Sequence, residues 1–240
     1  MIYTTDQLNK LYDGITGRAI AHCRFTRNMI GGMPADEKGI RTFLTVQAKI
    51  PEGEALDQAV KRVMGEEVLT SQPGDELNEV ETYGVKVVRK DADGRPWLGD
   101  WMLKACLKNA FSRTGLYVSK KGAKGDTAEM GRVVAVDASL LDPTNPHKIY
   151  IVDDDGAPAQ THYEQFRGRV STPLGPKSIV SDVEAIDAGA RFCFQFRWYN
   201  GKLGEKDIAT VFAAAQVIGV GSARAYESGK FTVEHLDIEV

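Results

Sequence analysis

The residues best suited to catalysis do not form a recognisable group in this sequence. The histidines lie far apart, and none has a second ligand at the spacing of a zinc site: His22, His147, His162 and His235. The chain also lacks a G-x-S-x-G elbow, a P-loop and a Rossmann glycine fingerprint. Residues 153–156 read as a solvated turn, because the rest of a calcium loop is missing. We therefore expect no metal and no cofactor, and we favour a non-catalytic protein.

Basic side chains are concentrated in a glycine-rich segment, residues 113–132. Lysine and arginine neutralise phosphates without reading base sequence, and glycines let a backbone approach a polyanion closely. The segment is therefore a candidate polyanion-binding loop, with a solubilising loop as the alternative. The acidic residues of the segment are Asp126 and Glu129. Its basic residues outnumber them and are Arg113, Lys120, Lys121, Lys124 and Arg132.

A second glycine-rich segment, residues 218–233, carries Arg224. Its Gly-Val-Gly triplet ends a predicted helix instead of opening one, so it is not the phosphate cradle of a dinucleotide-binding fold. An arginine in such a loop can contact one phosphate through two nitrogen atoms. Lys104 and Lys108 offer similar chemistry on a helix, where residues four apart are separated by about 6 Å along one face.

Length and composition place the chain among ordinary folded proteins. It has 240 residues, 42% of them hydrophobic and 26% charged, which excludes wholesale disorder. The formal net charge of -3 excludes a generally basic nucleic-acid-binding protein, so any such surface must be a local patch. Three distant cysteines indicate a reducing compartment, and we expect a cytoplasmic protein with no signal peptide and no membrane span.

Hydrophobic periodicity predicts an α+β protein. Helical spacing marks residues 4–15, 56–64, 101–111 with Asp100 as the N-cap, and 208–219. Alternation predicts strands over residues 18–29, 41–50, 83–90, 148–152, 166–171, 179–186, 191–199 and 231–240. The order of these elements favours an open sheet backed by helices on one face. The other face and the rim of such a sheet remain available to a single strand of nucleic acid.

Four passages together resemble the RAMP superfamily, the ferredoxin-like RNA-binding proteins of CRISPR systems. Residues 218–233 resemble the glycine-rich loop of that family, and residues 96–108 resemble the start of its first core helix. Residues 182–196 are similar to the strand pair before its second helix, and residues 18–29 to its opening strand. Ala105 stands where the family usually has glycine.

The resemblance implies a ferredoxin-like or RRM-like open antiparallel sheet backed by helices, in one domain over residues 1–240. Residues 113–135 and 153–178 would be its clearest insertions, and one of them would form a thumb that reaches the next subunit. The implied function is binding of single-stranded RNA, or DNA, by a subunit that stacks along the strand in a CRISPR-like ribonucleoprotein, or by a solitary relative carried by a virus or mobile element. Copies of the chain and other effector-complex subunits would be its partners, with no membrane involved.

The residues that we expect to hold the strand are basic and come from several elements. The main candidates are Lys104, Lys108, Lys120, Lys121, Lys124 and Arg224, and the secondary ones are Arg24, Arg27, Arg167 and Arg169.

Two alternatives remain at this stage. The protein would be a RAMP-type endoribonuclease if Asp36, in the loop after the first strand, or His22 supported cleavage. It would be a purely structural, self-assembling protein if aromatic residues such as Trp97, Trp101 and Tyr117 served a protein interface.

Overall fold

The strand with the cleanest predicted alternation, β10 (Arg191–Tyr199), lies at the centre of the structure. The computed structural model describes residues 16–34, 37–46, 51–66, 86–116, 134–137, 147–172, 175–199, 203–222 and 227–239, together with Thr4, Gln7 and Arg224. Phe192, Phe194, Phe196 and Trp198 of β10 are all buried, while the residues between them are partly exposed. The alternation predicted from the sequence is confirmed.

The main sheet is antiparallel and open. β1 (Thr16–Phe25) lies between β10 and β11 (Phe231–Glu239) and runs antiparallel to both. Two short strands share the other edge of β10: β6 (Val134–Asp137) pairs with residues 195–198 and β7 (Lys148–Val152) with residues 191–192. β5 (Trp97–Gly99) adds to β7.

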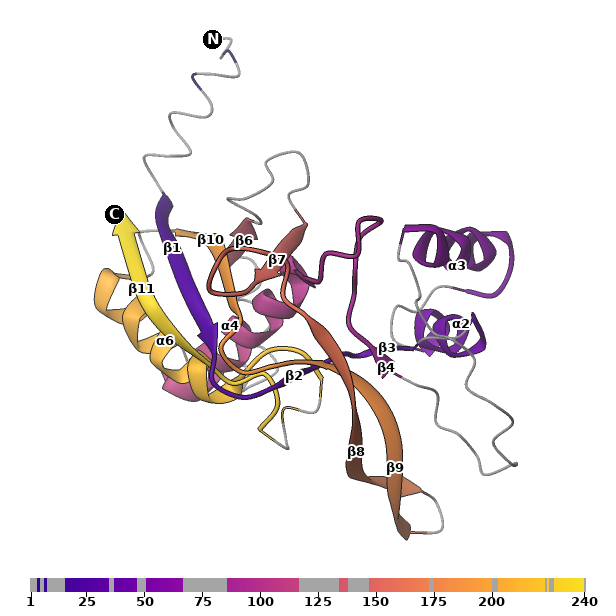
Figure 1. The fold of residues 1–240 in the computed structure, drawn as a ribbon. Helices are drawn as coiled ribbons and strands as arrows, with labels where there is room; N and C mark the ends of the chain where they lie inside the picture. The colour runs from indigo at the N-terminus through magenta and orange to yellow at the C-terminus, as the bar shows by residue number, and fades with distance from the viewer. Residues whose placement is uncertain are drawn as a thin grey trace.

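Two helices cover one face of this sheet (Figure 1), and their amphipathic sequences account for their position. α4 (Asp100–Thr114) and α6 (Glu205–Ile218) each bury one apolar stripe against the strands. The chain order β1, α4, β6 with β7, β10, α6 and β11 is a ferredoxin-like arrangement with insertions. The predicted α+β fold, an open antiparallel sheet backed by helices, is confirmed.

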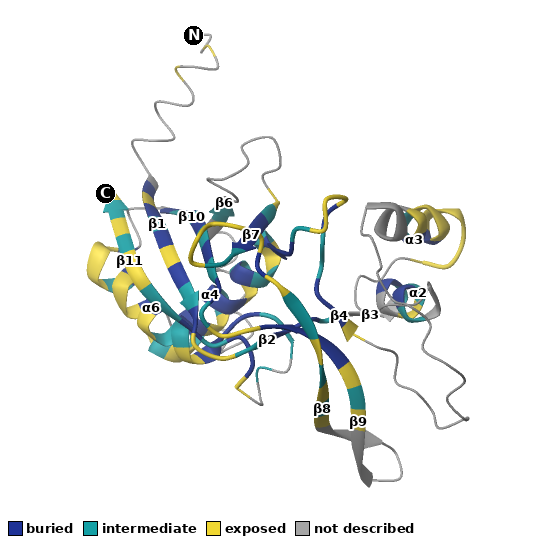
Figure 2. Ribbon diagram, viewed as in Figure 1, coloured by how far each residue is buried: buried dark blue, intermediate teal, exposed yellow. Residues whose placement is uncertain are grey.

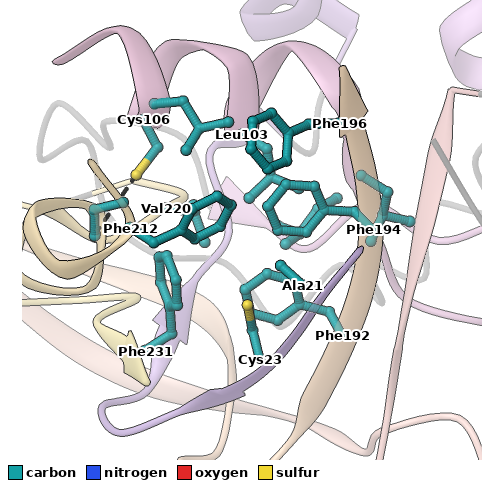
Figure 3. Packing of buried hydrophobic residues seen from close by; sticks show 14 of the residues in the cluster. Ala21, Cys23, Leu103, Cys106, Phe192, Phe194, Phe196, Phe212, Val220 and Phe231 are labelled. Carbon is teal, nitrogen blue, oxygen red and sulfur yellow. Dashed lines mark hydrogen bonds between the residues drawn. The ribbon is translucent and has the colours of Figure 1, made fainter. Parts of the chain in front are cut away.

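The core between the sheet and the helices is aromatic (Figure 3). The ring of Phe212 on α6 lies 6.1 Å from that of Phe194 and 5.0 Å from that of Phe196. Cys106 on α4 is fully buried beside α6, and burial raises the pKa of its thiol to about 12. Burial likewise raises the pKa of Cys23 well above its ordinary value, so neither thiol is a nucleophile at neutral pH.

A long hairpin projects from this body (Figure 1). β8 (Thr161–Thr172) and β9 (Gly175–Ile186) pair along their whole length, and the predicted strands 166–171 and 179–186 lie within them. Among the described residues, the base of β9 is the part of the hairpin that joins other strands, through β2 (Met29–Ile30) and β4 (Lys86–Val87). β4 pairs in turn with β3 (Met33–Pro34). Accordingly, β9 is buried at residues 183–186 and exposed at Val180 (Figure 2).

The strand predicted over residues 41–50 is wrong as far as the structure describes it, because residues 37–46 form a helix, α2 (Glu37–Val46). Ile40 and Leu44 are one helical turn apart and pack with Leu56 and Val60 of α3 (Glu54–Glu66). Apolar residues at every second position also contain pairs spaced four apart, so the same pattern suits a helix that has a partner. The predicted helix over residues 56–64 is confirmed within α3.

Three further element boundaries differ from the predictions. The strand predicted over residues 18–29 ends at Phe25 and resumes only at β2, and the one predicted over residues 83–90 is reduced to β4 among the described residues. α4 begins at Asp100 itself, with Gly99 as the N-cap, so the carboxylate lies in the first turn instead of capping it. Nearly all of the helix predicted over residues 4–15 lies outside the described residues. Within the described part of the chain, no helix is long and apolar enough to cross a membrane.

Candidate nucleic-acid interface

The glycine-rich loop after α6 is held in place by the first strand region. The N–H of Gly229 donates to the carbonyl of Asn28 at 2.9 Å, and the N–H of Val220 donates to the carbonyl of Gly229 at 2.9 Å. The buried hydroxyl of Ser228 accepts the N–H of Ile30 at 3.0 Å and donates to Asn28 at 3.1 Å. The described ends of the loop, residues 219–222 and 227–230, are therefore anchored to the rest of the fold.

The glycines at the two ends of this loop serve its own packing. Gly219 and Gly229 both have positive φ angles, 75° and 66°. A Cβ atom on Gly229 would lie 1.8 Å from the carbonyl oxygen of Val220. These two glycines therefore explain the close approach of the loop ends without any contact to a ligand.

We predict that Gly229→Ala destabilises the protein by more than Gly156→Ala does. Both positions have positive φ angles, 66° and 82°, which cost a side chain about 1–2 kcal/mol. Gly156 has open space around it, whereas Gly229 faces the backbone of Val220, so only Gly229→Ala adds a steric clash. Urea denaturation of both variants measures the difference, and equal losses would contradict the packing role of Gly229.

The outward face of α4 carries two of the main candidates, Lys104 and Lys108. Both are half-buried one turn apart, and among the described residues neither contacts a carboxylate. Trp101 lies on the same outward face, 46% exposed, one turn before Lys104. The structure thus brings two cations and one exposed aromatic ring together on one helix.

Arg224 lies beside the opposite flank of α4. Its charge opposes the rise that burial causes in the pKa of Cys106, so the guanidinium is near that thiol. Helical geometry separates Cys106 from Lys104 by about 200° around the axis. Arg224 therefore lies nearer to the buried side of α4 than to the side that carries the two lysines.

The open face of the sheet is a poorer phosphate site than we expected. Arg24 contacts Glu234 at 2.5 Å and Asp154 at 2.7 Å, and these hydrogen bonds raise the pKa of its guanidinium. Arg191 contacts the same Asp154 at 3.0 Å, and Arg18 pairs with Glu239. Because each arginine already has a carboxylate partner, an incoming phosphate would have to displace it.

The other predicted site residues lie apart from α4. Arg27 is exposed and lies 3.7 Å from Glu227, and Arg167 is exposed on β8 of the projecting hairpin. Arg169 belongs to the same strand. The predictions for Lys120, Lys121 and Lys124, and for Asp36, fall outside the described residues.

His22 lies on the open face of the sheet, beside Cys193 and His235. Its Nε2 is 3.9 Å from the Sγ of Cys193, and its ring centroid is 6.0 Å from that of His235. Burial raises the pKa of Cys193 to about 11, so this thiol is protonated at neutral pH. Within the described part of the chain, no three His, Cys, Asp or Glu residues are grouped as metal ligands would be.

A pocket that the sequence did not predict opens at the start of α4. It encloses about 190 Å³ between the two glycine-rich turns and a tryptophan pair. Arg89 lies 4.9 Å from the ring centroid of Trp101 and 5.4 Å from that of Trp97. The tight turn at residues 91–95 brings Arg89 opposite Trp97. The backbone N–H of Trp97 donates to the backbone carbonyl of Arg89 at 3.0 Å. The turn was visible in the sequence, but the pairing across it was not inferred.

A buried ion pair fixes the segment that carries Arg89. Glu184 on β9 is 3% exposed and pairs with Lys90. Its carboxylate also accepts the N–H of Val88 at 2.9 Å and the hydroxyl of Thr161 at 2.6 Å. The base of the hairpin and the wall of the pocket are thus joined by one hydrogen-bond network.

Comparison with known proteins gives a structural similarity and no sequence match. No protein-family model matches the chain, and no curated protein sequence matches it. A chain of the Type III-B Cmr-beta structure bound to cognate target RNA, determined by cryo-EM, is similar with a TM-score of 0.48 and 8% sequence identity. The similar region covers 97% of this chain and 64% of that one, so this chain spans less than two thirds of the length of that protein.

Proposed function

We propose that this protein binds single-stranded nucleic acid, RNA in the first place, along the outward face of α4 and does not cut it. The observation that carries the proposal is the pair Lys104 and Lys108, which have no carboxylate partner among the described residues. The two lysines are separated by about 6 Å along the helix axis, a spacing comparable with that of successive phosphates on an extended strand. On the open sheet face, in contrast, Arg18, Arg24 and Arg191 each already have a carboxylate partner.

Local placement of charge matters here because the whole chain carries a net charge of -3. The overall field does not attract a polyanion, so affinity must come from contacts at short range. Contacts to phosphates act on every sequence alike and weaken as salt rises. The proposal therefore predicts binding that is salt-dependent and indifferent to base sequence.

The finer part of the proposal is that copies of this protein stack along the strand. Its support is the resemblance of residues 218–233 and 96–108 to RAMP motifs, together with the projecting hairpin of β8 and β9, residues 161–186, which overlaps the insertion expected over residues 153–178. The exposed residues of that hairpin include Tyr163, Arg167 and Val180. In this arrangement the hairpin contacts the neighbouring copy, as a backbone subunit of a CRISPR-like ribonucleoprotein or as a solitary relative.

The binding test is a salt titration. We expect labelled single-stranded RNA to bind more tightly than a duplex of equal length, and log Kd to change linearly with log salt between roughly 50 and 200 mM. Single-stranded DNA run in parallel distinguishes the two nucleic acids. No binding at low salt, or tight binding that salt leaves unchanged, would overturn the proposal.

Mass photometry tests the stacking separately. If copies assemble along the strand, the mass of the complex rises in steps with oligonucleotide length. A fixed oligomer whose mass is indifferent to RNA would instead support the purely structural alternative.

A further inference from the structure

We propose that the pocket at the start of α4 holds one unstacked nucleobase of the bound strand. We call it the base pocket, and its lining includes Gly31, Gly32, Gly221, Arg89, Trp97 and Trp101. This inference rests on the proposed function and adds a ligand chemistry to it, because a ring-sized site binds the base and not the phosphate.

Close packing of glycines forms one wall of the base pocket. A Cβ atom on Gly31 would lie 2.2 Å from the backbone of Val87, and one on Gly32 would lie 2.0 Å from the hydroxyl oxygen of Ser222. The first strand region therefore lies directly against both the glycine-rich loop and the segment before Arg89. The enclosed 190 Å³ is smaller than the roughly 300–1,000 Å³ of sites for drug-sized ligands, and it suits a single ring system.

The opposite wall offers the planar surface of an exposed indole. The indole of Trp101 is 46% exposed. It packs so closely on Gly99 that a Cβ atom on this glycine would lie 2.4 Å from the ring. The guanidinium of Arg89 lies 4.9 Å from the Trp101 ring centroid. Arginine beside an exposed indole is the combination on which unstacked bases stack, whatever their identity.

The third feature is an indole N–H without an acceptor. Trp97 is 7% exposed, and its buried Nε1 has no hydrogen-bond partner among the described residues. Buried donors in proteins are nearly always paired. Trp97 lines the pocket, and Lys148, 5.2 Å from the Trp97 ring centroid, adds positive charge beside that ring.

The base pocket is also continuous with the proposed phosphate contacts. Trp101 precedes Lys104 by three residues, about 4.5 Å along the helix axis. A nucleotide whose base stacks on Trp101 therefore places its phosphate within reach of Lys104.

Trp101→Ala tests the inference in the full-length protein. We expect the Kd for oligouridylate RNA to rise roughly 5- to 150-fold, the loss of one stacked base, with an unchanged salt slope because no phosphate contact is removed. Trp101→Phe should recover part of the affinity. Val217→Ala removes another exposed apolar side chain, on α6, and should leave the Kd unchanged. Thermal unfolding of the variants verifies that they fold.

Two further ligands identify what fills the pocket. An abasic oligonucleotide should bind the wild type and Trp101→Ala equally, since it has no base to stack. Uridine monophosphate that bound as tightly as the strand would overturn the assignment to a base within a strand.

If RNA binds with its salt dependence intact but Trp101→Ala does not change the Kd, the base pocket is wrong and the proposed function stands. If the wild type binds no RNA, the proposed function itself fails.

Discussion

Glu184→Ala is expected to lower the free energy of unfolding by about 3–5 kcal/mol, the usual cost of removing one partner from a buried ion pair. The side chains of Lys90 and Glu184 are only 14% and 4% exposed. Without the carboxylate, the Lys90 ammonium loses its counter-charge and the N–H of Val88 loses its acceptor. Both groups remain in a site that water does not reach freely, so neither loss is offset by hydration.

Asp182→Ala provides the matched control, because Asp182 is exposed two residues earlier on the same strand. Its replacement should change the free energy of unfolding by about 0.5 kcal/mol or less. A second variant separates charge from packing: Lys90→Met combined with Glu184→Leu should cost less than Glu184→Ala alone, since no buried charge is left unpaired. Urea denaturation measures all three, and a single-variant loss no larger than that of Asp182→Ala would contradict the structural role of the pair.

The elements of the core were predictable because each one buries a face whose period is visible in its own residues. Phe192, Phe194 and Phe196 alternate on one strand, and the apolar stripe of α4 recurs every three to four residues. Lys104 and Lys108 could be paired for the same reason, since a helix fixes their relation locally. The error over residues 41–50 arose where a short apolar pattern fits two periods and the contact with α3 decides between them.

The base pocket was not predictable in that way, because its parts meet through contacts between distant residues. Arg89 is oriented by a segment that Glu184 holds from 94 residues away through Lys90. The glycine-rich loop reaches the pocket by bonding to Asn28 and Ile30 at the other end of the chain. Local periodicity contains no information about such pairings, so Trp97 and Trp101 were named from the sequence but Arg89 was not.

Lys104→Glu combined with Lys108→Glu is expected to raise the Kd for single-stranded RNA by at least about 100-fold at low salt, at roughly tenfold per lost phosphate contact. The salt slope should fall by about 1.4, because each contact to a single strand contributes roughly 0.7. The side chains of both lysines are half-buried along α4. The glutamate carboxylates that replace the ammonium groups would therefore face the same nucleic-acid strand and repel its phosphates. The effect should be the same for every base sequence.

The control for this variant has the same net charge and a different location. Lys61→Glu combined with Lys206→Glu also takes the chain from -3 to -7, a change of two charges at each of two positions. Both residues are exposed, and they lie on α3 and α6 instead of α4. If net charge alone governed binding, the two double variants would lose the same affinity and the α4 site would be refuted. If the site is local, the control binds within a few-fold of the wild type, because charges farther from the strand than about 10 Å are screened at 0.1 M salt.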